Sequence, residues 1–167
     1  MSTLRDTLEL FAFNRWANEL TLDAAATLTP EQYARPLGGS FPSLRATLQH
    51  MMGAEISWLA RFHGEVGGRF PDLSVYDDVP KLRAQWDEVW AEQQRFLATL
   101  DEDALRRPLP FRFRDGTEGA QPLVEALRHV VNHASYHRGQ VVMLIRQLGG
   151  IPAGTDYITY CLVREAR

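Results

Sequence analysis

Hydrophobic residues recur at helical spacing along four long stretches of the chain. In a helix, side chains three or four positions apart lie on one face, so such spacing builds an apolar stripe. The first stretch covers residues 4–28 without glycine or proline, and the second follows Pro42 and ends at Gly64. The third covers about residues 80–100, and the fourth about residues 122–148. The pattern predicts four long amphipathic helices.

Shorter elements are predicted between and after these helices. Residues 29–32, Thr-Pro-Glu-Gln, have the pattern of a capping box with proline at the first helical position, which predicts a short helical turn near Tyr33. Apolar and other residues alternate over 109–114 ahead of Asp115-Gly116, which predicts a small hairpin or extended turn. Residues 151–167 are expected to fold back as a turn and a short helix.

These elements together predict an all-α protein built as a four-helix bundle. A chain of 167 residues with 45% hydrophobic residues is of the usual length for one domain, here residues 1–167, and can bury one core. Residues 64–79, rich in glycine, proline and aspartate, form an unusually long connection. Fully extended, this connection could span the bundle.

Charge and composition narrow the classes of partner. The chain has 18 basic and 21 acidic residues and a net charge of -3, which argues against a nucleic-acid partner. The purest aliphatic run, residues 141–145, is far shorter than the roughly 20 residues that cross a bilayer. Charged Arg5, Asp6 and Glu9 argue against a secretory signal, and the single Cys161 suits a reducing compartment. We therefore expect a cytoplasmic protein.

The fourth predicted helix carries three histidines at intervals of four. His129, His133 and His137 lie on nearly one face, and neutral imidazoles one turn apart can share a metal ion. His129 and His137 are about 12 Å apart along the axis, too far to share one ion comfortably. The pair is therefore 129/133 or 133/137. His137 continues the apolar stripe, where an unliganded imidazole would need another buried partner, so the second pair is favoured.

A third ligand is expected from another helix, because catalytic zinc sites usually have three protein ligands and one open position. His63 lies at a helix end beside glycine, where a solvated side chain is the ordinary outcome. His50 lies within the second helix, near the middle of its apolar face. The sequence thus favours His50, His133 and His137 as metal ligands over three hydrogen-bonded core imidazoles.

Four segments of the chain resemble the DinB/YfiT-like family of metalloenzymes. They are FNRWAN, SFPSLRATLQHMMGAEISWLARF, LRHVVNHASYHRGQV and RQLGGIPAGTDYITY. The resemblance implies a bundle in up-down-down-up order, with its crossover in residues 64–79, and a metal triad of His50, His133 and His137. His129 matches a recurrent histidine outside the triad, for which a supporting or core role is expected. The implied cofactor is one divalent ion, zinc or nickel, with iron or manganese as alternatives, and relatives are often homodimers.

The resemblance also implies a reaction. Characterised members of that family join low-molecular-weight thiols such as bacillithiol or mycothiol to other molecules, so a small thiol and an electrophilic substrate are the expected partners. Three neutral imidazoles leave the ion's charge unreduced, which lowers the pKa of a bound thiol, or of water for hydrolysis. The alternative from another class is a non-catalytic metal-binding or dimer-forming stress protein, which a fourth protein ligand would favour.

Two charged residues near the predicted ligands are further candidates. Arg138, next to His137, could receive an anionic part of a substrate. Glu55, about one turn beyond His50, could orient a ligand or move a proton. The ordinary alternatives are an exposed arginine and a solvated or hydrogen-bonded glutamate.

Overall fold

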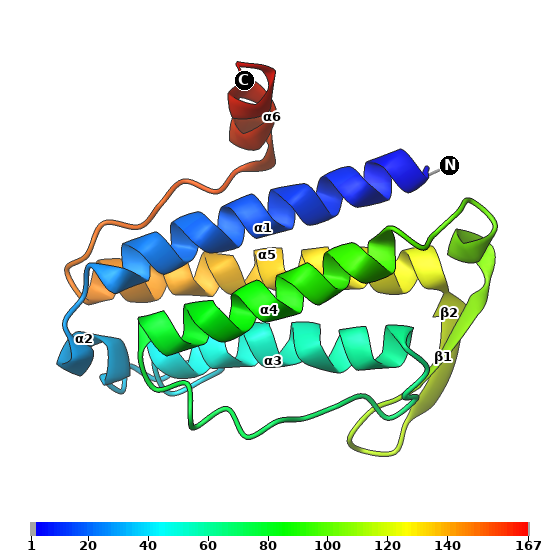
Figure 1. Cartoon of the computed structure of the whole chain (residues 1–167). Coiled ribbons are helices and arrows are strands. Elements are labelled where there is room, and N and C mark those ends of the chain that lie inside the picture. The colour runs from blue at the N-terminus through cyan, green and yellow to red at the C-terminus, as the bar shows by residue number, and fades with distance from the viewer. Residues whose placement is uncertain (1–2, 167) are drawn as a thin grey trace.

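The computed structural model describes residues 3–166, and four long helices form its bundle (Figure 1). They are α1 (Leu4–Ala26), α3 (Leu44–Phe62), α4 (Val79–Leu97) and α5 (Leu123–Gln147). Helices α1 and α5 run in one direction, and α3 and α4 run in the other (Figure 1). The predicted four-helix bundle in up-down-down-up order is confirmed.

Apolar stripes on the four helices meet in the interior of the bundle. Helices α1 and α3 each pack against both α4 and α5. Leu48, Leu82 and Val141 are completely buried in one core cluster, and Phe11 and Leu127 are almost completely buried in a second. Each such side chain contributes about 1.5–3 kcal/mol when it leaves water. The stripes predicted from the sequence are therefore the faces that stabilise the bundle.

Polar side chains cap the N-termini of α1, α2, α3 and α4. The predicted capping box is present, since Thr29 Oγ1 accepts from the Gln32 amide at the start of α2 (Pro30–Ala34). Thr29 is extended at ψ 159°, and the amides of Thr27 and Leu28 donate to Ala24 and Ala25 in a tightened last turn, so α1 ends at Ala26 and not at residue 28. Helix α4 ends at Leu97, three residues earlier than predicted.

The segment between α3 and α4 runs back along the bundle and brings the chain to the end where α3 began (Figure 1). Gly64, at φ +93°, ends α3. The side chain of Gln49 donates to the carbonyls of Leu73 and Tyr76, at 2.8 and 2.9 Å, and fixes the segment against α3. The predicted crossover therefore lies where expected.

The predicted hairpin is an antiparallel pair, β1 (Pro108–Arg112) and β2 (Glu118–Pro122), which follows the short 3-10 helix η1 (Ala104–Arg106). The Arg112 amide donates to the Val66 carbonyl at 2.9 Å. This bond joins the hairpin to the α3–α4 connection. Both segments consequently reach the same end of α3.

The chain beyond α5 runs back past α1 to α6 (Tyr157–Glu165), which stands outside the bundle (Figure 1). Tyr157 and Tyr160 pack edge-on against Phe13, with ring centroids 5.1 and 5.7 Å away. This agrees with the predicted turn and short helix, apart from residue 167, which lies outside the described residues. Within residues 3–166, every helix is too short or too polar to cross a membrane.

Candidate metal centre

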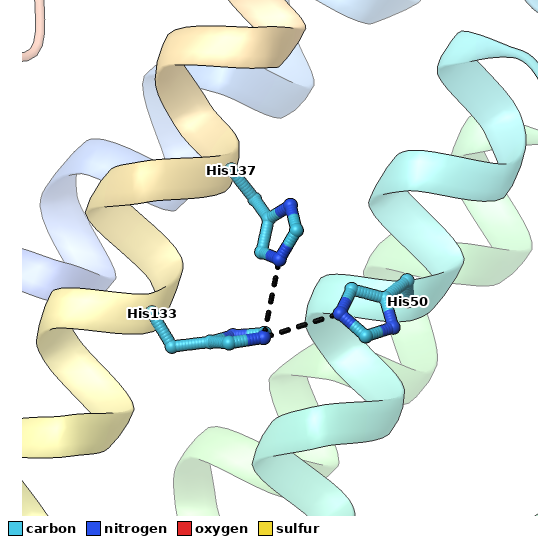
Figure 2. Close-up of side chains that lie close together, drawn as sticks. All are labelled: His50, His133 and His137. Atoms are coloured by element: carbon cyan, nitrogen blue, oxygen red, sulfur yellow. Dashed lines mark hydrogen bonds between the residues drawn. The ribbon is translucent and has the colours of Figure 1, made fainter. Parts of the chain in front are cut away.

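Three imidazoles from two helices converge in the bundle. His50 extends from α3, and His133 and His137 extend from successive turns of α5 (Figure 2). His133 Nε2 lies 3.1 Å from His50 Nε2 and 3.1 Å from His137 Nε2. One nitrogen of each ring lies within 4.8 Å of the other two.

These distances fit three ligands of one metal ion. Metal–nitrogen bonds of about 2.0–2.1 Å at tetrahedral angles hold two nitrogens about 3.3 Å apart. Hydrogen bonding alone explains the cluster less well. His133 Nε2 has either one proton or one lone pair, so it can make only one good hydrogen bond with its two neighbours. A cation would use the lone pairs of all three rings.

Neighbouring side chains hold the rings in place. Phe41 stacks on His50, with ring centroids 4.1 Å apart. His137 Nδ1 donates to Gln140 Oε1 at 2.7 Å, and Gln140 Nε2 donates to Ser40 Oγ at 3.1 Å. Because its proton is on Nδ1, His137 presents a lone pair at Nε2. This is the tautomer that a metal ligand requires.

Burial favours the neutral form of two of these rings. Loss of solvent, and next the nearby His137, lower the pKa of His50 to about 4. Loss of solvent, followed by the neighbouring His137, His50 and His129, lowers the pKa of His133 to about 4. Both side chains are therefore neutral at pH 7 and can donate their lone pairs to a cation.

A cavity of about 430 Å³ opens beside the cluster, and His50 and His133 form part of its wall. Its walls come from α3, α5, the α3–α4 connection and the hairpin turn. Small side chains on α3 leave room for it, because Gly53, Ala54 and Ser57 face this space. A small molecule in the cavity would lie next to two of the three imidazoles.

Comparison with known proteins identifies the family. The sequence model of the DinB family matches residues 1–165. The chain belongs to the DinB family. It is 27% identical to protein DinB of Bacillus subtilis (strain 168) over 162 residues, 94% of each chain. A crystal structure of a DinB-like protein from Bacillus cereus superimposes with a TM-score of 0.72 at 21% identity, covering 91% of this chain and 97% of that one. The structural similarity shows that this chain and the Bacillus cereus protein share a fold.

Two histidines of this DinB-family protein lie outside the cluster. His129 is on the cavity wall, with its ring centroid 5.0 Å from that of Trp58 and 5.8 Å from that of His133. Burial, followed by the charge of Arg61, lowers the pKa of His129. His63 is exposed at the end of α3, and its Nε2 lies 3.1 Å from Glu92. The structure thus separates His63 from the three converging rings, as expected.

The structure supports neither of the site roles suggested for Arg138 and Glu55. Glu55 is hydrogen-bonded, as in its ordinary alternative, whereas Arg138 is buried and not exposed. Arg138 is 3% exposed and donates to Asn14 Oδ1 and Asn18 Oδ1, at 2.6 and 2.9 Å, and it does not line the cavity beside the histidines. Glu55 is 4% exposed, and neither oxygen contacts a histidine. Its carboxylate accepts four hydrogen bonds, from Asn14, Asn18, Trp86 and Gln93. Both residues stabilise a polar network inside the bundle.

Several residues that support the cluster and enclose the cavity are not predicted from the sequence. Gln140 could have been found, because it lies three positions after His137 and therefore on the same helix face. Trp58 follows the apolar stripe of α3, and such a position is typical of an ordinary core residue. Phe70 and Arg114 lie in irregular segments, where no periodic pattern predicts which side chains meet.

Proposed function

We propose that this DinB-family protein binds one divalent metal ion through Nε2 of His50, His133 and His137 and transfers a low-molecular-weight thiol to an electrophile. The observation that carries the proposal is the convergence of three imidazole nitrogens beside a cavity. Zinc or nickel suits three neutral nitrogen ligands best, with iron or manganese as alternatives.

The ion, when bound, supplies positive charge that lowers the pKa of a thiol and so favours the thiolate at neutral pH. The three histidines hold that charge without reducing it, because neutral imidazoles add no negative charge. The cavity walls orient the electrophile and limit the access of water. A new carbon–sulfur bond forms, the leaving group departs with its electron pair, and the thiol proton passes to solvent. No protein nucleophile is required.

The geometry of the site does not separate thiol transfer from hydrolysis, but it argues against a purely structural ion. The same charge would lower the pKa of water, so hydrolysis shares every feature of the site. A purely structural ion is normally closed by four protein ligands. The cluster in the described part of the chain offers three, which supports a site that keeps one position for a substrate.

Metal content tests the ligands. We expect about one ion per chain in the purified protein, and loss of most of it in His50→Ala and His137→Ala. His63→Ala is the matched control, because His63 caps the C-terminus of α3 and lies outside the cluster. This variant should retain the metal. Inductively coupled plasma mass spectrometry measures the metal content of the wild type and the three variants. Equal metal in all of them would contradict the proposed ligands.

Thiol conjugation to a bromobimane dye tests the reaction. We expect turnover by the metal-loaded protein that requires both the dye and a thiol, and its loss in His50→Ala. Product formation from an ester substrate without thiol would instead support a hydrolase. A metal-loaded protein inactive with a panel of thiols, including bacillithiol and mycothiol, would favour the structural role.

A further inference from the structure

The cavity beside the histidines combines aromatic walls with positive charge. Trp58, Phe70 and Phe113 supply aromatic surface, and Arg61 and Arg114 supply two guanidinium groups. None of the lining residues in the described chain is acidic. The wall therefore offers apolar contact and a positive field but no negative side chain to exclude an anion.

Arg61 forms a buried part of the cavity wall. It is 3% exposed, and it donates to Ser57 Oγ at 2.6 Å and to the carbonyls of Gly67 and Arg112, at 3.2 and 3.0 Å. These bonds join α3 to the α3–α4 connection and to the hairpin. Its buried Nε has no hydrogen-bond partner. All its partners are uncharged, so its positive charge is not neutralised by a neighbouring carboxylate.

Arg114 lies at the mouth of the cavity, in the hairpin turn. Its guanidinium carbon is 4.1 Å from the centroid of the Phe70 ring, which holds the charged group over an aromatic face. The ion pairs found among residues 3–166 do not include Arg114. The nearby Arg112, by contrast, faces Glu118 at 3.8 Å and does not line the cavity. Of the two arginines that line the cavity in the described residues, Arg114 is exposed and is therefore the one that can meet an incoming anion.

We propose that this cavity binds a small aromatic molecule that carries an anionic group. The aromatic ring would pack among Trp58, Phe70 and Phe113, and the anion would pair with Arg114 at the mouth. A volume of about 430 Å³ is in the range of small-molecule sites. This inference rests on the proposed function, in which the bound molecule is the electrophilic substrate, held next to the thiol site.

Two probes of equal size and different charge test the inference. 2-Naphthalenesulfonate is anionic and a weak metal ligand, and 2-naphthalenemethanol is neutral. Titration calorimetry with the zinc-loaded protein should give at least fivefold tighter binding of the sulfonate. Arg114→Gln should weaken the sulfonate about fivefold, as expected for a partly exposed ion pair, and leave the alcohol unchanged. Arg112→Gln, the matched control, should change neither affinity.

A cavity-filling variant shows where the probes bind. Ala54→Leu places three more carbon atoms in the cavity wall and should weaken both probes at least tenfold. Equal affinities of the two probes for the wild type, an unchanged sulfonate affinity in Arg114→Gln, or unchanged affinities in Ala54→Leu would each overturn the inference. Absence of thiol-dependent turnover in the same samples, with the sulfonate preference intact, would overturn the proposed reaction and leave the anion site standing.

Discussion

Gln140 controls the orientation and tautomer of His137 through one hydrogen bond of 2.7 Å. Loss of such a partner typically lowers metal affinity about 10–100-fold. We expect Gln140→Ala to weaken zinc binding about tenfold, measured by competition with a chromogenic chelator. Gln147→Ala, an exposed change on the same helix, is the control and should leave the affinity unchanged. Equal affinities in the two variants would show that His137 needs no such support.

Glu55 and Arg138 form the charged ends of a buried network, and Asn14 and Asn18 bridge them. Burial lowers the pKa of Arg138 to about 10, and the carboxylate of Glu55 acts in the opposite direction by favouring the charged form. Removing the carboxylate leaves four donors without an acceptor and a buried positive charge without its counterpart. The network therefore stabilises the bundle only as a complete set.

We expect Glu55→Ala to lower the free energy of unfolding by about 3–5 kcal/mol, measured by urea denaturation. The exposed Glu88→Ala on α4 should change it by less than about 0.5 kcal/mol. The folded fraction of Glu55→Ala should retain its metal, because no oxygen of Glu55 contacts a histidine. Loss of metal from folded Glu55→Ala would restore the ligand-orienting role that the geometry contradicts.

The network also explains why the sequence does not predict the buried position of Arg138. Charged side chains are usually exposed, so averages over residue types assign Arg138 to the surface. Here Asn14 and Asn18 lie one turn apart on α1. Their amide groups form hydrogen bonds with both Arg138 and Glu55, which offset the cost of burying these side chains in the core. The pair is visible in the segment FNRWAN, but only the bundle shows which residues it faces. Contacts of this kind depend on packing between helices.

The four long helices are predictable because each carries a continuous apolar stripe. Their exact ends are harder to predict, because local contacts of a few residues determine them. The spacing of His133 and His137 follows from one helix, so these two could be paired from the sequence. His50 belongs to another helix, and its convergence with them depends on the rotation of α3 about its axis. Phe70 and Arg114 reach the cavity through irregular segments, whose paths only tertiary contacts determine.

The α3–α4 connection depends on glycine where it crosses Arg61. Gly68 has φ +70°, and a Cβ atom there would lie 2.5 Å from Ser57 Oγ and 2.8 Å from the Arg61 guanidinium. We expect Gly68→Ala to destabilise the protein by about 1–3 kcal/mol and to weaken binding of 2-naphthalenesulfonate. Gly67→Ala is the control, because its Cβ would meet no atom within 4 Å and its φ is ordinary. Similar urea midpoints for both variants would contradict this dependence.

The bundle as a unit partly buries the imidazoles of His50 and His133, and this placement has a consequence for stability. The pKa of His50 and of His133 is about 4 in the folded protein, against about 6.5 in an unfolded chain. Between these values the unfolded chain binds protons that the folded protein does not. Acidification from pH 6.5 to 4 therefore favours unfolding, and below pH 4 these two groups add no further loss.

We expect the urea midpoint of the metal-free protein, kept in chelator, to fall steadily over that pH range. A variant with both His50→Gln and His133→Gln should show a flatter dependence, because glutamine does not titrate. The difference should be smaller than for fully buried groups, since both side chains are only partly buried and solvent screens them. Parallel pH profiles for the two proteins would mean that other groups control acid unfolding. A steeper profile for the wild type would show that the cluster is held neutral by the fold even without metal, ready for a cation at pH 7.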